Sequence, residues 1–485
     1  MIAFLSVPIA LAFPLLEGML LLSFLERRKH VLSHLERLCT GFFLGLPFSS
    51  FLFFFAFLAG VPLTFFGFLV LHLLLIAALL LLAWKWVPKR SLWKLLFPQD
   101  APSCSFGFSG VPQWIQVVCI FLLLWVLFKI AIGAYDLFAF PPYFNDIYAN
   151  WNMRAKAFFT SQSLLLDLPR SHRFFFGGRV PSYPLTVYFT KVWLAMVSGG
   201  WNEAAVNSVH LLWFLALIGM FAAALSRLTS AVFATLGVFV LVSLPLFFLH
   251  GVNAYADVLM SASLFLPLLF WYRWMLEEDE TGQHVWLLLQ SVSSALMLFV
   301  KSEALLLFLP PLTLLLALSS LWKTRSLRIS IRTMGVFLGI VSLVLLPWAL
   351  FKVIVGLEFG NAQSVGQFVL SPHPDVPLAV LNELFYTGSF LLFSPVFLLF
   401  LALSWRYWSH HAVGFLLLFL GIVLLGQFGI YYLTPLAAEA IRHTGYGRGI
   451  VQLLPSLTFI AMLLLQSIIA TSIRERSRVL PSPPR

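Results

Sequence analysis

The sequence has few charged residues for its length, and this scarcity sets the class of protein. Only 10% of the 485 residues are Asp, Glu, Lys or Arg, whereas 61% are hydrophobic. A soluble domain cannot bury that much apolar surface, and apolar runs of about 18 residues or more are typical of membrane-spanning helices. Lipid offers the backbone no hydrogen-bond partners, so helices, which satisfy their own, are favoured. We therefore expect an all-α polytopic membrane protein with no large soluble domain.

Cysteine is also scarce, and several common motifs are missing. The three cysteines, Cys39, Cys104 and Cys119, show no metal-binding spacing and imply no disulfide. No Gly-rich phosphate loop and no basic–aromatic RNA motif occurs, so the net charge of +11 does not indicate a nucleic-acid partner. Residues 1–24 carry no basic residue, and the basic residues follow them. Because a cleaved signal peptide has the opposite order, we interpret this segment as a retained first span.

Long apolar runs predict about 13 transmembrane helices. Their approximate ranges are 1–24, 39–59, 63–84, 113–134, 204–225, 229–249, 256–275, 284–300, 302–322, 333–355, 382–403, 412–433 and 450–472.

Basic residues in the loops predict the orientation of these helices. If the spans alternate, segments 25–38, 85–112, 323–332 and 473–485, with four Lys or Arg each, lie on one side, as do Arg227, Arg273 and Arg406. The short segments of the other side hold only Lys301, Arg442 and Arg448. Lys and Arg accumulate in cytoplasmic loops, so the first side is predicted to be cytoplasmic. The N-terminus is then outside and the C-terminus inside.

One break in hydrophobicity, from Tyr135 to Tyr183, falls on the predicted outer side. The apolar segment 184–197 follows it. Counting this segment as a full span would place segments 323–332 and 473–485 outside, against the charge rule. We therefore predict a re-entrant or interfacial helix at 184–197, within a large external loop over 135–203.

Ionisable groups collect on this outer side, near the ends of the predicted spans. They are Asp146, Asp257, Lys301, Glu303, Arg442, His443 and Arg448, with Arg154, Lys156, Arg170, His172, Arg173 and Arg179 in the large loop. A carboxylate there can accept a proton from a hydroxyl or hold a metal ion, and cations can bind a phosphate leaving group. The combination suits sugar transfer from a phospholipid carrier.

Structural roles are open for the same residues. Asp257 could cap the following helix, and Lys301 with Glu303 could form an ion pair in a turn. Arg442 and Arg448 could anchor the chain at the interface. Asp136 is the rival of Asp146 within the loop because it lies closer to the preceding span.

Several short motifs resemble those of the GT-C membrane glycosyltransferases, the protein mannosyltransferase-like group that uses polyprenyl-phosphate sugars. The motifs are Asp146-x4-Trp151-x2-Arg154-Ala155-Lys156, Ser182-Tyr183-Pro184-Leu185, Tyr255-Ala256-Asp257, Lys301-Ser302-Glu303-Ala304-Leu305 and Arg448-Gly449-Ile450-Val451-Gln452. They occur in the order of that group, over roughly residues 113–472. Ser302 and Ala304 depart from the Lys-Asn-Glu-Gly-Leu pattern of the group, and three spans precede the loop where the group often has one.

The resemblance implies a GT-C-like fold with a large external first catalytic loop containing short juxtamembrane helices. It divides the chain into a three-span extension (1–112), a transmembrane catalytic domain (113–472) and a cytoplasmic basic tail (473–485). It also implies transfer of a hexose or pentose, with inversion, from a polyprenyl-phosphate donor to an extracytoplasmic glycan, lipid or protein of the cell envelope. The protein would lie in the inner (plasma) membrane, with its active site facing outward.

The resemblance assigns roles to individual residues. Asp146 would be the general base or would orient the acceptor hydroxyl, and Asp257 would assist at the acceptor or at a metal ion. Lys301 and Arg448 would hold the donor phosphate. Glu303, Arg154, Lys156, Tyr183 and His443 would support the site. A divalent cation, Mg²⁺ or Mn²⁺ on Asp146 and Asp257, is one expectation, and no cofactor is the other.

Two other functions fit an outward-facing membrane protein of this composition. A flippase or transporter of lipid-linked sugars would need ionisable groups at mid-membrane and discontinuous helices, and such proteins often have repeated halves. A non-catalytic subunit of envelope assembly would use the external charges only as anchors.

Overall fold

The computed structural model is helical in the parts of the chain that it describes, which are residues 2–86, 92–104, 106–144, 146–166, 182–357, 359, 370–409 and 412–479. The helices are α1 (Ile2–Leu25), α2 (His34–Leu58), α3 (Phe65–Trp86), α4 (Leu92–Leu96), α5 (Gln113–Ala139), η1 (Ile147–Asn152), α6 (Met153–Ser161), α8 (Thr186–Val197), α9 (Glu203–Leu228), α10 (Ala231–Ser243), α11 (Pro245–Val252), α12 (Asp257–Leu276), α13 (Glu280–Met297), η2 (Ala304–Phe308), α14 (Leu309–Thr324), α15 (Leu327–Val355), α17 (Val376–Phe385), α18 (Phe393–Leu403), α19 (Trp405–Trp408), α20 (Ala412–Leu433), α21 (Ala437–Ile441) and α22 (Tyr446–Val479). These ranges contain no β-strand, which confirms the predicted all-α class.

Within the described ranges, ten helices are long and apolar enough to cross a membrane, or eleven if the bent pair α10–α11 is one span. Two further predicted spans are not among these helices. The segment 284–300 falls on α13, which has 18 residues, and 382–403 is divided between α17 and α18. The total of about 13 spans therefore stays a prediction.

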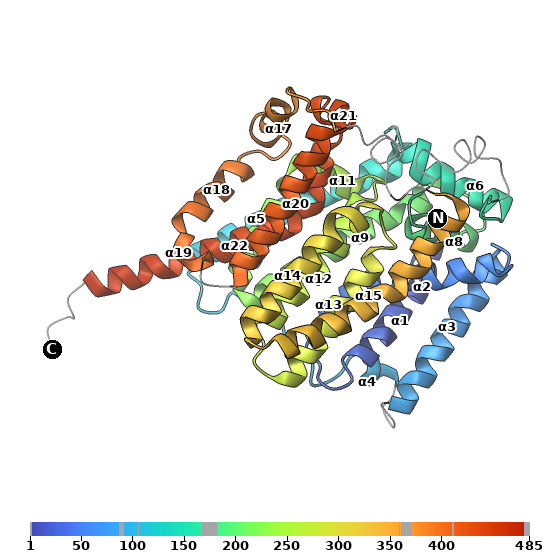
Figure 1. Ribbon diagram of the computed structural model, residues 1–485, viewed down its shortest axis with the longest axis horizontal. Coiled ribbons are helices and arrows are strands. Elements are labelled where there is room, and N and C mark those ends of the chain that lie inside the picture. Colours follow the sequence, from blue (N-terminus) through green and yellow to red (C-terminus); the bar gives the residue numbers. More distant parts are fainter. Residues whose placement is uncertain are drawn as a thin grey trace.

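Helix α12 lies at the centre of the bundle. In its most apolar window 94% of the residues are buried, against 17% for α3 and for α5. It packs against α9, α13 and α22, and Figure 1 shows α3 at one edge of the molecule and α18 at the opposite edge. Residues of the predicted N-terminal extension (1–112) and of the predicted catalytic domain (113–472) belong to one hydrophobic core. The division into these domains stays a prediction.

Glycines let α1 and α2 pack closely. A Cβ atom at Gly18 would overlap the carbonyl oxygen of Gly41, and one at Gly45 would overlap that of Pro14. Small residues four apart allow helix backbones to approach in this way inside a membrane. The contact fixes the position of α2, whose first turn carries a polar cluster described below.

A sharp bend of 80° separates α10 from α11. Leu244 has extended backbone angles, and Pro245 follows as the first residue of α11. Proline lacks an N–H group and disfavours helical angles in the preceding residue, so the helix breaks here. The bend directs α11 toward the N-terminus of α12, where the chain turns through residues 253–256.

Two stretches of π-helix, η1 and η2, lie directly after two of the predicted site residues. Asp146 precedes η1, and Glu303 precedes η2. For η2 a cause is visible in the sequence, because Pro310 and Pro311 have no N–H group to donate to the carbonyl groups four residues earlier. Such π-bulges are frequent at functional sites.

The predicted external loop contains short helices, as expected. Helix α8 has 12 residues, about 18 Å, which is shorter than the roughly 30 Å of a hydrocarbon core. This length fits a re-entrant or interfacial helix. Residues 167–181, with Arg170, His172, Arg173 and Arg179, lie outside the described part of the loop.

Candidate active site

Asp257 is the centre of a buried polar cluster at the N-terminus of α12. Its side chain is 0% exposed. Oδ1 accepts hydrogen bonds from Lys301 Nζ and from Gln452 Nε2, each at 2.9 Å. Oδ2 lies 3.1 Å from Arg448 Nη2 and 3.1 Å from His250 Nδ1. A buried carboxylate is tolerated only when it is paired and hydrogen-bonded, and here both oxygens have partners.

Arg448 connects the two aspartates that were predicted to be catalytic. Its Nη2 atom lies 2.8 Å from Asp146 Oδ2 as well as 3.1 Å from Asp257 Oδ2. Nε of Arg448 is 3.3 Å from the same Asp257 oxygen. Asp146 is 27% exposed and Arg448 29%, so this side of the cluster is open while Asp257 is not. The guanidinium also lies over the ring of Tyr255, 5.4 Å from its centroid.

Lys301 joins the cluster to the turn that precedes η2. Its ammonium group lies 2.8 Å from Glu303 Oε1 in addition to its contact with Asp257. Burial lowers the pKa of Lys301, but the charges of Asp257 and Glu303 outweigh this effect, and the net shift is upward. The lysine is therefore a permanent cation. Its side chain is 2% exposed and pairs with two carboxylates, so its contact with a donor phosphate stays a prediction.

Aromatic rings form one wall of the site. Trp151 is stacked between Tyr183, with ring centroids 5.3 Å apart, and Tyr188, at 5.4 Å. The hydroxyl of Tyr183 donates to Glu303 Oε1 at 3.4 Å. Burial raises the pKa of Tyr183 well above its ordinary value, so its hydroxyl stays protonated and can donate. The predicted Trp151 and Tyr183 motifs thus lie together.

Arg154 supports this wall from α6. It is buried, and its Nη1 atom donates to the carbonyl oxygen of Tyr183 at 3.1 Å. The guanidinium lies over the ring of Tyr188, 4.5 Å from the centroid. This geometry makes Arg154 a positioning residue, which holds the segment before α8 against α6.

Two of the predicted supporting residues lie outside the cluster. Lys156 is exposed on α6. His443 lies 2.9 Å from Glu383 of α17 through its Nδ1 atom. The rival aspartate, Asp136, lines a small cavity of about 20 Å³ together with Glu203 and with Ile147, the residue after Asp146.

From the sequence, no role was predicted for His250 or for Gln452, although Gln452 belongs to the Arg448 motif. Gln452 could have been found, because it follows Arg448 by four residues and shares its helix face. His250 gave no such signal. It reaches Asp257 because α11 is bent, and its ring stacks on Tyr255 with centroids 4.3 Å apart.

A divalent cation held by both Asp146 and Asp257, which was one expectation, fits this arrangement poorly. Both oxygens of Asp257 face cations or N–H donors, and Asp146 contributes one oxygen to Arg448. No group of three or more His, Cys, Asp or Glu side chains suited to a metal ion occurs among the described residues. A divalent ion on both aspartates would have to displace Arg448, and metal dependence stays a prediction.

Comparison with known proteins reveals a match in structure only. No family model and no curated protein matches the sequence. The crystal structure of ArnT from Cupriavidus metallidurans in the apo state superposes with a TM-score of 0.50 and 15% identity, over 73% of this chain and 61% of the ArnT chain. The chain has the fold of ArnT over the aligned part.

The aligned part spans less than two thirds of ArnT. A second structure, of ArnT bound to undecaprenyl phosphate, superposes with a TM-score of 0.49 and 15% identity, over 73% of this chain and 64% of that one. The fold shared with the apo ArnT structure confirms the predicted GT-C-like fold class, whereas the number of spans stays a prediction. The roles of individual residues rest on the geometry described above.

Proposed function

We propose that this protein is a membrane glycosyltransferase that moves a sugar from a polyprenyl-phosphate donor to a hydroxyl group of an extracytoplasmic glycan, lipid or protein. The observation that carries the proposal is the position of Arg448 between Asp146 and Asp257, beside Lys301. Two cations and a partly exposed carboxylate at one helix end are the groups that such a reaction needs.

The proposed reaction is a single displacement at the anomeric carbon. The acceptor hydroxyl attacks this carbon on the face opposite the phosphate, its proton passes to Asp146, and the carbon–oxygen bond to the phosphate breaks. The electron pair of that bond goes to the phosphate, which leaves as polyprenyl phosphate, and the anomeric centre is inverted. Lys301 and Arg448 neutralise the charge that develops on the phosphate.

Arg448 has to exchange partners in this scheme. While it is paired with Asp146, the carboxylate faces a cation instead of a hydroxyl. When Arg448 contacts the donor phosphate, Asp146 becomes free to accept a proton. Asp257, fully buried, keeps both cations in place and is better described as a positioning residue than as one that contacts the acceptor.

Complementation of a deletion strain tests the proposal. Envelope glycans and lipids of the strain are compared with those of its parent by mass spectrometry, and we expect one species to lack a sugar. Wild-type protein and the matched control Asp136→Asn restore it, whereas Asp146→Asn does not, because loss of a general base costs about 10²- to 10⁴-fold in rate. Full restoration by Asp146→Asn would refute the assignment of the base.

A flippase or transporter of lipid-linked sugars is the second candidate, and two observations favour it. The pair α10–α11 is discontinuous, and a buried pair of Glu17 and His72 joins α1 to α3, with Oε1 and Nδ1 2.7 Å apart. Ionisable groups within spans often mark a transport path. Reconstituted vesicles separate the two functions, since movement of the lipid-linked sugar without any glycosidic product would support transport.

A further inference from the structure

A second polar cluster lies at the end of the bundle opposite the candidate active site. Arg273 follows Asp257 by sixteen residues on α12, which is about 24 Å along a helix. Arg227 lies in the last turn of α9, and Glu36 lies in the first turn of α2. The loop charges predict this end to be cytoplasmic.

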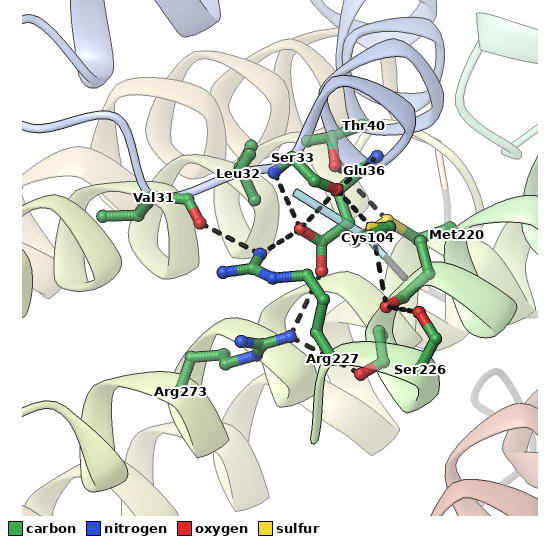
Figure 2. A network of polar contacts seen from close by, with 12 residues as sticks. Val31, Leu32, Ser33, Glu36, Thr40, Cys104, Met220, Ser226, Arg227 and Arg273 are labelled. Atoms are coloured by element: carbon green, nitrogen blue, oxygen red, sulfur yellow. Dashed lines mark hydrogen bonds and ion pairs between the residues drawn. The ribbon is translucent and has the colours of Figure 1, made fainter. Parts of the chain in front are cut away.

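Two arginines share one carboxylate in this cluster. Glu36 is 1% exposed, and the N-cap Ser33 holds it through a reciprocal capping box. Arg227 Nη1 pairs with Glu36 Oε2, and Arg273 Nη2 lies 3.2 Å from Oε1. Figure 2 shows both guanidinium groups reaching the same carboxylate. One positive charge of the pair is therefore left unbalanced by Glu36.

The hydrogen bonds of these two arginines leave one buried N–H group without a partner in the described part of the chain. Arg227 Nη1 also donates to the carbonyl oxygen of Val31 at 3.1 Å, and Arg273 Nη2 to that of Ala224 at 3.5 Å. Arg273 Nε is buried and has no hydrogen-bond partner among the described residues. A buried N–H group without a partner costs free energy that a ligand acceptor would recover.

The two arginines border a cavity of about 330 Å³, which is large enough for a small ligand. Lys29 lies at the wall of the cavity, is 39% exposed, and pairs with Glu277 at 3.3 Å and Asp279 at 3.0 Å. Glu277 itself lines the cavity and pairs with Lys29, whereas the two arginines share the single carboxylate of Glu36. Negative charge is favoured at the arginine end of the cavity.

We propose that this cavity binds a phosphate group through Arg227 and Arg273. The planar forks of two arginines suit the tetrahedral oxygens of a phosphate, which would balance the excess charge. The phosphate belongs either to the headgroup of an anionic phospholipid or to a soluble phosphate compound. Basic pockets between membrane helices on the cytoplasmic side bind lipid headgroups in this manner. The site is separate from the proposed transferase chemistry.

Binding by the full-length protein, purified in detergent and freed of lipid, tests the proposal. Native mass spectrometry measures retention of phosphatidylglycerol, and calorimetry measures inorganic phosphate against chloride at equal ionic strength. The variants are Arg273→Gln and Lys29→Gln. Arg328→Gln is the matched control, because it removes one exposed charge from the same predicted side without lining the cavity.

We expect the affinity to fall at least about tenfold in Arg273→Gln, and about threefold in Lys29→Gln, with no change in Arg328→Gln. A loss confined to phosphatidylglycerol identifies a lipid headgroup, and a loss with inorganic phosphate alone identifies a soluble ligand. Phosphate bound at the candidate active site is unaffected by these substitutions. Equal affinity of wild type and both variants, or no binding of either probe, would overturn the proposal. If Arg273→Gln does not fold, Arg227→Gln, which removes the other proposed contact, replaces it with the same expected loss, and an unchanged affinity would overturn the proposal.

Discussion

Replacement of Arg448 by lysine or by glutamine separates the geometric role of this side chain from its charge. Nη2 of Arg448 contacts Asp146 at 2.8 Å and Asp257 at 3.1 Å. Lysine keeps the charge, but its side chain is shorter and ends in a single ammonium group. It therefore cannot bridge two carboxylates as a guanidinium does. We expect Arg448→Lys to lose about 10²- to 10³-fold in sugar transfer, or about 2.7–4 kcal/mol, the usual cost of one charge-stabilising donor.

The two variants should also differ in stability: Arg448→Lys should be about as stable as the wild type, and Arg448→Gln should be less stable. Arg448→Lys still balances the buried Asp257 and should unfold near the wild-type temperature. Arg448→Gln leaves that carboxylate with Lys301 as its one strong cation, and breaking a buried ion pair typically costs about 3–5 kcal/mol. A thiol-reactive dye reports unfolding, because Cys39 and Cys119 are buried in the folded protein.

Transfer from a lipid-linked donor and dye-detected unfolding are measured on the same preparations. Arg442→Gln is the control, since Arg442 is exposed at the same end of the bundle. Wild-type transfer by Arg448→Lys would refute the argument that the two carboxylates must be bridged. An unchanged unfolding temperature for Arg448→Gln would refute the argument that Asp257 needs this cation.

Three further predictions concern the surrounding structure. Burial lowers the pKa of Lys191 to about 7, so the unfolded chain binds more protons above pH 7, and stability should rise from pH 7 toward 10. Lys191→Met should remove this rise in thermal unfolding profiles, and a slope identical to wild type would contradict it. Gly45→Ala should cost about 1–3 kcal/mol of stability because its Cβ overlaps a backbone carbonyl of α1. Gly421→Ala, where a Cβ meets no atom within 4 Å, should cost nothing in the same dye assay, and equal losses would argue against close α1–α2 packing. His443→Ala should leave transfer unchanged, since His443 pairs with Glu383, and a large loss would place it in the site after all.

The grouping of site residues could be predicted because each lies at a helix end on one predicted side. Asp146 and Arg448 are separated by 302 positions, yet the alternating direction of successive spans assigns both to the outer boundary. Chemistry then limits the partners, because a buried carboxylate such as Asp257 requires cations. The partners of His443 could not be predicted in this way, since an exposed polar side chain near the same boundary can pair with any neighbour.

The distribution of Lys and Arg in the loops and the alternation of the spans predict at which end of the bundle a side chain lies. The packing of the helices decides which residues it contacts there. Helix α12 illustrates this division, because it carries Asp257 at its N-terminus and Arg273 in its last turn, as the helix dipole favours. The sequence explains Arg273 as one of many predicted cytoplasmic cations. That Glu36 draws Arg273 and Arg227 together depends on the close approach of α1 and α2, which places the first turn of α2 beside α9 and α12. A polar cluster at each end of one buried helix is therefore a product of tertiary packing, which the order of residues along the chain does not reveal.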